Sequence, residues 1–151
     1  MNKNQSLPWD NPRFRNWLAV LRAEKAVVRA LSRSIGEIGL KLPQLDILMN
    51  IYRHPGISQH DLARRLLVGR SNITMLLPQL EADGVVLRES DPADRRAMRL
   101  TLTPAGEEIL MRALAVYTRL IDKVMASSTP AECDLIGEVM RRVEEAVKGE
   151  E

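Results

Sequence analysis

Apolar residues recur at the spacing of an α-helix in six stretches of the chain. Four of these stretches contain a proline near their start, where its missing amide hydrogen costs a helix nothing. They predict helices over residues 12–35, 43–52, 104–124 and 130–147. The first helix and the two last helices each carry an apolar stripe, which indicates surfaces that pack against another element.

Two shorter stretches in the middle of the chain predict a pair of helices joined by a tight turn. Ser58 precedes the first of them and Asp61 stands three residues later, as in a capping box that starts a helix. A turn over residues 67–69 leads into the second helix, which is expected over 70–83 and is closed by Gly84. Two short helices connected in this way are typical of a helix-turn-helix motif.

After Gly84 the apolar pattern changes to the alternating period of β-strands. Residues 85–90 and 97–102 are expected to pair as a hairpin whose tip is the polar segment 91–96. The predicted fold is mainly α with a small β-hairpin wing, a winged helix-turn-helix flanked by long N- and C-terminal helices. We expect one structural unit with three regions: an N-terminal dimerisation helix (1–41), a winged helix-turn-helix (42–103) and C-terminal dimerisation helices (104–151).

Composition limits the classes of function. The chain is 45% hydrophobic and 28% charged, has no apolar run long enough to cross a membrane, and begins with a polar segment rather than a signal peptide. With the single cysteine Cys133 no internal disulfide can form, so we expect a cytoplasmic protein. Phosphate loops, nucleophile elbows and metalloprotease motifs are absent, so we expect neither an enzyme nor a bound cofactor or metal.

The second helix of the central pair has side chains that suit a DNA groove. If Ile73 lies at the centre of its buried face, the outward and flanking positions are Ser71, Asn72, Thr74, Met75 and Pro78. Short polar side chains near the positive N-terminus of a helix approach base edges and phosphates without collision. A plain solvated helix explains this pattern equally well.

The residues at the tip of the hairpin indicate DNA binding rather than a plain solvated turn. Arg95 and Arg96 are adjacent on a projecting loop, where guanidinium groups reach phosphates or enter a minor groove. Asp94 is expected to orient one of them. Because a helix-turn-helix followed at once by an arginine-tipped hairpin is rarer than either part, we expect the protein to bind double-stranded DNA.

The order of motifs from Leu42 to Gly106 resembles the MarR family of bacterial transcriptional regulators. The resemblance is carried by Asp61-Leu62-Ala63, Ile73-Thr74, Leu80-Glu81-Ala82-Asp83-Gly84-Val85-Val86, Asp91-Pro92-Ala93-Asp94-Arg95-Arg96 and Leu100-Thr101-Leu102-Thr103-Pro104-Ala105-Gly106. It implies a homodimer of interlocked first, fifth and sixth helices, with each winged unit on one half-site of a pseudo-palindromic operator. The apolar stripes support the dimer independently, because one chain of 151 residues does not readily cover them.

The resemblance also implies roles for individual residues. By position, Ser71, Asn72 and Thr74 approach bases, Ser58 and Arg70 touch the DNA backbone, and Arg95 or Arg96 enters the minor groove beside Asp94. The implied activity is that of a ligand-responsive repressor, whose small anionic or aromatic effector binds between the dimer helices and the winged unit. Trp17, Tyr52 and Tyr117 either line such a crevice or belong to the core.

The recognition helix departs from the family pattern at three outward positions. Met75 replaces a basic or polar residue, Pro78 a common aspartate, and Gln79 an arginine or lysine. Pro78 also removes a hydrogen bond to the carbonyl of Thr74 and can kink the helix. The missing aspartate takes away a partner for a wing arginine, which puts the family's contact between helix and wing in doubt.

Other interpretations stay open. A winged fold can serve as a protein-interaction module without binding DNA. Some relatives bind zinc or sense oxidants, so His54 and His60 could form a metal site with a carboxylate or Cys133. Surface histidines and a buried or interfacial packing cysteine are the simpler interpretation.

Overall fold

The computed structural model describes residues 6–66 and 73–148. Contacts divide the chain into two compact units, Met1–Tyr117 and Thr118–Glu151. This boundary differs from the three regions expected from the sequence, whose roles stay predictions. Within the described ranges, none of the helices combines the length and the apolar character that a membrane crossing requires.

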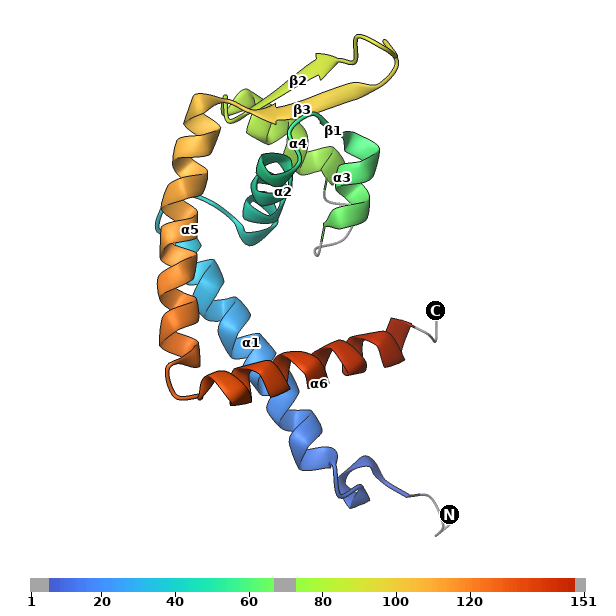
Figure 1. The fold of residues 1–151 in the computed structure, drawn as a ribbon, viewed down its shortest axis with the longest axis vertical. Helices are drawn as coiled ribbons and strands as arrows, with labels where there is room; N and C mark the ends of the chain where they lie inside the picture. Colours follow the sequence, from blue (N-terminus) through green and yellow to red (C-terminus); the bar gives the residue numbers. More distant parts are fainter. Residues whose placement is uncertain (1–5, 67–72, 149–151) are drawn as a thin grey trace. The chain divides into compact units, whose positions relative to one another are not determined.

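The first unit contains most of the regular structure (Figure 1). In chain order its elements are a short 3₁₀ helix η1 (Pro8–Asp10), α1 (Phe14–Gly36), α2 (Leu42–Arg53), β1 (Ile57–Ser58), α3 (Gln59–Arg65), α4 (Ile73–Ala82), β2 (Val86–Ser90), β3 (Met98–Leu102) and α5 (Pro104–Met125). The last of these continues past Tyr117 into the second unit. The predicted helices of this unit and the predicted hairpin are confirmed where they are described. The expected turn over 67–69 and the expected start of the second central helix at 70–72 lie outside the described residues.

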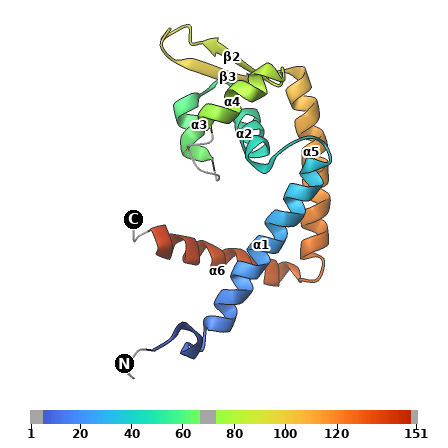
Figure 2. The same ribbon diagram turned by 180° about the vertical axis from the view of Figure 1, so that it is seen from behind.

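One hydrophobic core joins the elements of this unit. Side chains with almost no exposure come from α1, α2, α3, α4, β3 and α5, and they include Ile35, Leu48, Leu62, Leu77, Leu80, Leu100 and Leu110. In two opposite views, α2, α3 and α4 lie together beneath the sheet (Figures 1 and 2). The short helices of the centre are thus held by tertiary packing, because helices of 7 and 10 residues are not stable alone.

The sheet has three strands, and the sequence indicates only two of them. Its order is β1-β3-β2, with both pairs antiparallel. Ile57 of β1 lies opposite Leu100, and Arg88 of β2 lies opposite Leu100 from the other side. The third strand was missed because two residues cannot display an alternating pattern, and Ser58 also serves as the cap of α3.

The end of α4 is fastened to the start of α5. Gly84 has the positive φ of 71° that ends a helix in a left-handed turn, and the amide of Val85 donates to the carbonyl of Leu80 at 3.1 Å. The hydroxyl of Thr103 donates to the Gly84 carbonyl at 2.6 Å and accepts from the Gly106 amide at 3.0 Å. Thr103 therefore caps α5 and ties that helix to the turn after α4.

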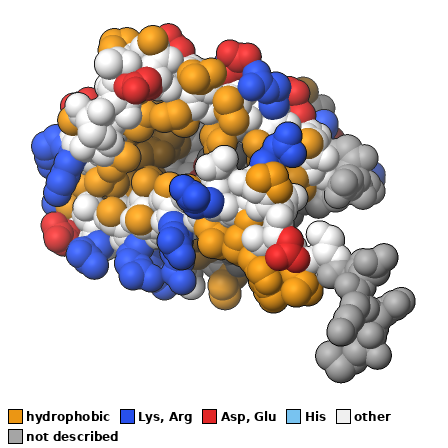
Figure 3. Space-filling model, turned by 90° about the horizontal axis from the view of Figure 1, so that it is seen from below, with side chains coloured by type: hydrophobic (Ala, Val, Ile, Leu, Met, Phe, Trp, Pro, Cys, Tyr) orange, Lys and Arg blue, Asp and Glu red, His pale blue; other side chains and the backbone are white. Residues whose placement is uncertain are grey.

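The second unit consists of the end of α5 and of α6 (Pro130–Lys148). Glu132 accepts from the amide and the hydroxyl of Thr129, as the Thr-Pro start predicts, and these hydrogen bonds hold the pKa of Glu132 below its ordinary value. No described residue of α6 is buried. Its exposed apolar side chains are Leu135, Ile136, Val143 and Val147, and hydrophobic side chains reach the surface over wide areas of the face in Figure 3.

Candidate nucleic-acid interface

The start of α3 is fixed by Ser58, as the sequence predicts. The Ser58 hydroxyl accepts a hydrogen bond from the Asp61 amide at 3.0 Å. The expected return bond from the Ser58 amide to Asp61 is replaced by one from the Ser58 hydroxyl to the Asp61 carboxylate, at 2.9 Å. Neither the capping nor the partial exposure of Ser58 tests its predicted contact with DNA, which stays a prediction.

Helix α4 has the two faces expected from its sequence. Ile73, Leu76, Leu77 and Leu80 are buried, whereas Thr74, Met75, Pro78 and Gln79 are exposed. The helix continues through Pro78 to Ala82. The predicted DNA-binding residues Arg70, Ser71 and Asn72 lie outside the described residues.

Two aspartates shape the tip of the wing. The Asp91 carboxylate accepts from the Ala93 amide at 2.8 Å, and the Asp94 carboxylate accepts from the Arg96 amide at 3.0 Å. Aspartate commonly stabilises turns through such bonds to the backbone two residues ahead. Within the described residues the Asp94 carboxylate bonds to the backbone of Arg96 and forms no ion pair with either tip guanidinium group, and its predicted part in DNA binding stays a prediction.

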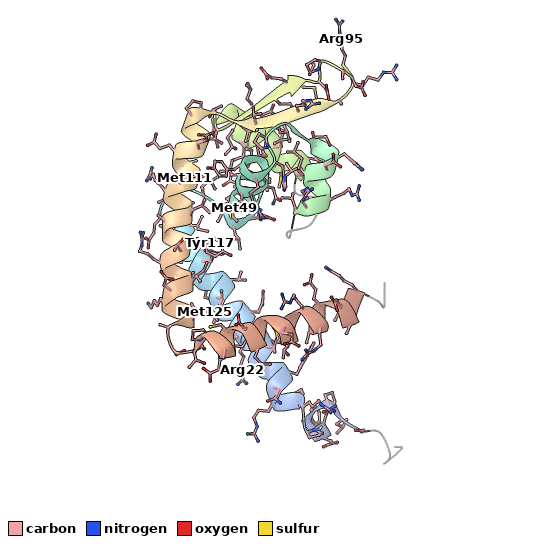
Figure 4. The ribbon with its side chains drawn as sticks, in the orientation of Figure 1. Arg22, Met49, Arg95, Met111, Tyr117 and Met125 are labelled. Atoms are coloured by element: carbon pink, nitrogen blue, oxygen red, sulfur yellow. The ribbon has the colours of Figure 1, made fainter. Side chains whose placement is uncertain are left out.

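Arg95 and Arg96 are exposed at this tip, and Arg95 points away from the hairpin in Figure 4. Neither guanidinium group forms an ion pair within residues 6–66 and 73–148. Arg99 behaves differently, because its Nε lies 2.8 Å from a carboxylate oxygen of Asp91. The Ala93 amide and then Arg99 hold the pKa of Asp91 below its ordinary value. Asp91 thus pairs with Arg99 and not with either tip arginine.

Arg88 connects the wing to both central helices, and sequence reasoning missed it. From β2 its Nε donates to the carboxylate of Glu81 on α4 at 2.9 Å, and its Nη1 donates to the amide oxygen of Gln59 on α3 at 3.3 Å. The Arg88 and Glu81 side chains are only 30% and 24% exposed. This contact between helix and wing uses residues other than Pro78, and it ties β2 to α3 and α4.

We expect Glu81→Gln to lower the free energy of unfolding by about 1 kcal/mol, because a partly buried charge-assisted hydrogen bond is replaced by a neutral one. The matched control is Glu138→Gln, which breaks the exposed pair of Glu138 with Arg142 on α6 and should cost at most about 0.5 kcal/mol. Urea unfolding followed by circular dichroism measures both values. Equal effects of the two substitutions would contradict a structural role for Arg88.

The three aromatic residues named for an effector crevice differ in exposure, and their role in such a crevice stays a prediction. Trp17 and Tyr52 are 53% and 45% exposed, so neither belongs to the core of the isolated chain, and Tyr117 is half-buried. A hollow of about 290 Å³ is lined by Trp17 together with Pro8, Asn11, Arg13 and Phe14, without either tyrosine. Cys133 is half-buried rather than buried, and the described ranges hold no group of three or more His, Cys, Asp or Glu placed to bind a metal ion.

Several known proteins are similar to this chain in sequence and in fold. The sequence model of the MarR family matches residues 38–97. The HTH-type transcriptional repressor Mb2911 of Mycobacterium bovis is 32% identical over 111 residues, which are 74% of this chain and 76% of that protein. The repressor CouR, solved bound to a 23-mer DNA duplex, is 27% identical with a TM-score of 0.75, over 83% of this chain and 89% of CouR. The PcaV regulator of Streptomyces coelicolor, solved with its natural ligand, is 22% identical with a TM-score of 0.77, over 95% of this chain and 98% of PcaV.

The matched region of the family model begins just before α2 and ends at residue 97, between the wing tip and β3. It therefore contains α2, α3, α4, β2 and the two tip arginines, but not β3. Mb2911, which exceeds 30% identity over more than two thirds of both chains, is a transcriptional repressor. The solved structures reproduce the winged helix together with its long flanking helices. By sequence and by fold, this chain belongs to the MarR family of transcriptional regulators.

Proposed function

We propose that the protein is a homodimeric, ligand-responsive repressor that binds a pseudo-palindromic operator in double-stranded DNA. The observation that carries this proposal is the pair of exposed guanidinium groups, Arg95 and Arg96, at the end of a wing beside a helix-turn-helix. They lack acidic partners in the described chain, so phosphates are their natural counter-charge. CouR, of similar fold and sequence, was solved on a DNA duplex.

The exposed apolar surface supports the dimer. Long helices at both ends of the chain expose large side chains to water, including Trp17, Leu21, Val28, Ile121, Val124, Leu135 and Ile136. Monomeric proteins rarely expose so many apolar residues at helical spacing, whereas an obligate dimer buries them. Two copies also place two wings and two recognition helices on one duplex, as a pseudo-palindrome requires.

The fastening of α5 to α4 supports control by a ligand. Thr103 bonds to the Gly84 carbonyl, and its own amide donates to the Val85 carbonyl at 3.1 Å, so no flexible linker separates the dimer helix from the DNA-binding part. A ligand that shifts α5 therefore changes the position of α4, and release from DNA follows if it binds the altered state better. In this proposal the effector releases the operator, and an effector that tightens binding would contradict that part.

Selection from a pool of random duplexes tests the proposed function. Repeated rounds of binding at moderate salt should enrich one sequence with two inverted half-sites about 10 base pairs apart, centre to centre. Light scattering of the complex should give two protomers per duplex. A pool that stays random, or a single half-site bound by one protomer, would contradict the proposal.

A further inference from the structure

The outward face of α4 lacks charge. Between Ile73 and Ala82 the only ionisable residue is Glu81, and Arg88 neutralises it. The exposed positions are Thr74, Met75, Pro78, Gln79 and, at the end of the helix, Ala82, and Met75 is 61% exposed. Charged contacts to phosphates therefore come from other parts of the chain, and this part of α4 offers DNA apolar surface, one hydroxyl and one amide.

The major groove presents an apolar feature that fits this face. Thymine carries its C5 methyl group there, and adenine presents a donor and an acceptor that an amide side chain can bind together. Met75 and Pro78 are three residues apart on the helix, so their Cβ atoms are separated by about 5–6 Å, a span of one to two base steps. The unbranched thioether of methionine adapts to a methyl group at the floor of a groove.

We propose that Met75 is a specificity-determining residue that recognises a thymine methyl group in each half-site of the operator. This inference rests on the proposed DNA binding and adds to it the base that α4 selects. The ring of Pro78 also offers DNA only apolar contact, and the exposed amide of Gln79 suits an adenine next to that thymine. The inference therefore predicts A·T pairs at the positions that Met75 and Gln79 contact.

Replacement of thymine by uracil tests this contact, since it removes the methyl group and leaves base pairing intact. The probe is the duplex enriched from the random pool, synthesised with deoxyuridine at one symmetric pair of positions at a time. For the wild-type protein, deoxyuridine at one symmetric pair of positions should weaken binding by about fourfold for each methyl group lost. Met75→Ala should bind the thymine and uracil duplexes equally at that pair, whereas Met75→Leu should keep the discrimination.

The outcomes separate this inference from the proposed function. If the enriched duplex binds but uracil has no effect at any position under α4, or if Met75→Ala discriminates like the wild type, Met75 is not the reader and the inference is wrong. If Met75→Ala instead changes the oligomeric state seen by light scattering, the residue packs against a second copy and the inference is also wrong. If no duplex is enriched at all, the proposed function fails first and the inference fails with it.

Discussion

Gly106→Ala is expected to cause a large loss of stability. A Cβ atom at position 106 would lie 2.0 Å from the carbonyl oxygen of Val85 and 2.9 Å from its carbonyl carbon. Both are backbone atoms, so α5 has to move away from the turn between α4 and β2. We expect a loss of about 3 kcal/mol, the upper end of what overpacking usually costs, and a Tm lower by about 6–12 °C.

Gly137→Ala is the matched control, because this glycine also lies inside a helix. Nothing lies within 4 Å of a Cβ built there, and the residue is exposed. Alanine should therefore stabilise α6 by up to about 1 kcal/mol, the ordinary advantage of alanine over glycine in a helix. Thermal unfolding at one fixed protein concentration compares the two variants. Shifts of the same sign would contradict the close approach of α5 to Val85.

Gly106→Ala also tests whether α5 passes changes in the dimer region to α4, because the contact of Gly106 with Val85 lies next to the hydrogen bonds of Thr103. A variant that stays folded below its Tm while α5 has moved should bind the operator more weakly, although position 106 is distant from the wing tip. Such a result supports α5 as the element that passes a change in the dimer region to α4.

Substitution of both tip arginines, Arg95→Ala with Arg96→Ala, is expected to cause the largest loss of DNA affinity. Both side chains are exposed and unpaired in the described chain, so their removal costs the fold little. We expect affinity for the selected duplex to fall about tenfold or more at physiological salt. The slope of log K against log salt should lose about 0.9 for each phosphate charge no longer neutralised. Fluorescence anisotropy at several salt concentrations measures both quantities.

Arg141→Ala with Arg142→Ala is the matched control for this experiment. This double substitution also removes two adjacent arginines, so it lowers the net charge of +2 by as much as the substitution at the wing tip does. The two arginines lie on α6 and not on the wing. DNA affinity should stay within about twofold of the wild type, because only general charge is lost. Equal losses in the two double variants would mean that total charge, and not the wing, governs binding.

The sequence reveals those features that depend on neighbours along the chain. Thr103 and Thr129 mark helix starts because a side-chain oxygen and a following proline act within one turn. The buried face of α4 is correctly placed because Ile73, Leu76, Leu77 and Leu80 follow the helical period. The exposed arginines of the wing follow from their position in a polar turn.

The features that sequence reasoning missed join residues that are far apart in the chain. Arg88 bonds to Gln59 across 29 positions, and no local pattern distinguishes it from other charged strand residues. Gly106 resembles any glycine that weakens a helix, and only the fold brings the Val85 carbonyl against it. Arg99 takes the acidic partner Asp91, whereas the sequence favours the adjacent Asp94 as a partner for the tip arginines. Spatial neighbours, and not periodicity, decide these contacts.

The salt dependence of binding to the selected duplex tests the central claim most directly. If the wings of two protomers bind one operator, their four tip arginines neutralise four phosphates. At about −0.9 for each phosphate, the slope of log K against log salt should be about −3.6 or steeper. A saturable complex with that slope, containing two protomers, is the predicted result. Weak binding that hardly changes with salt would contradict the account and favour a winged helix that contacts proteins instead of DNA.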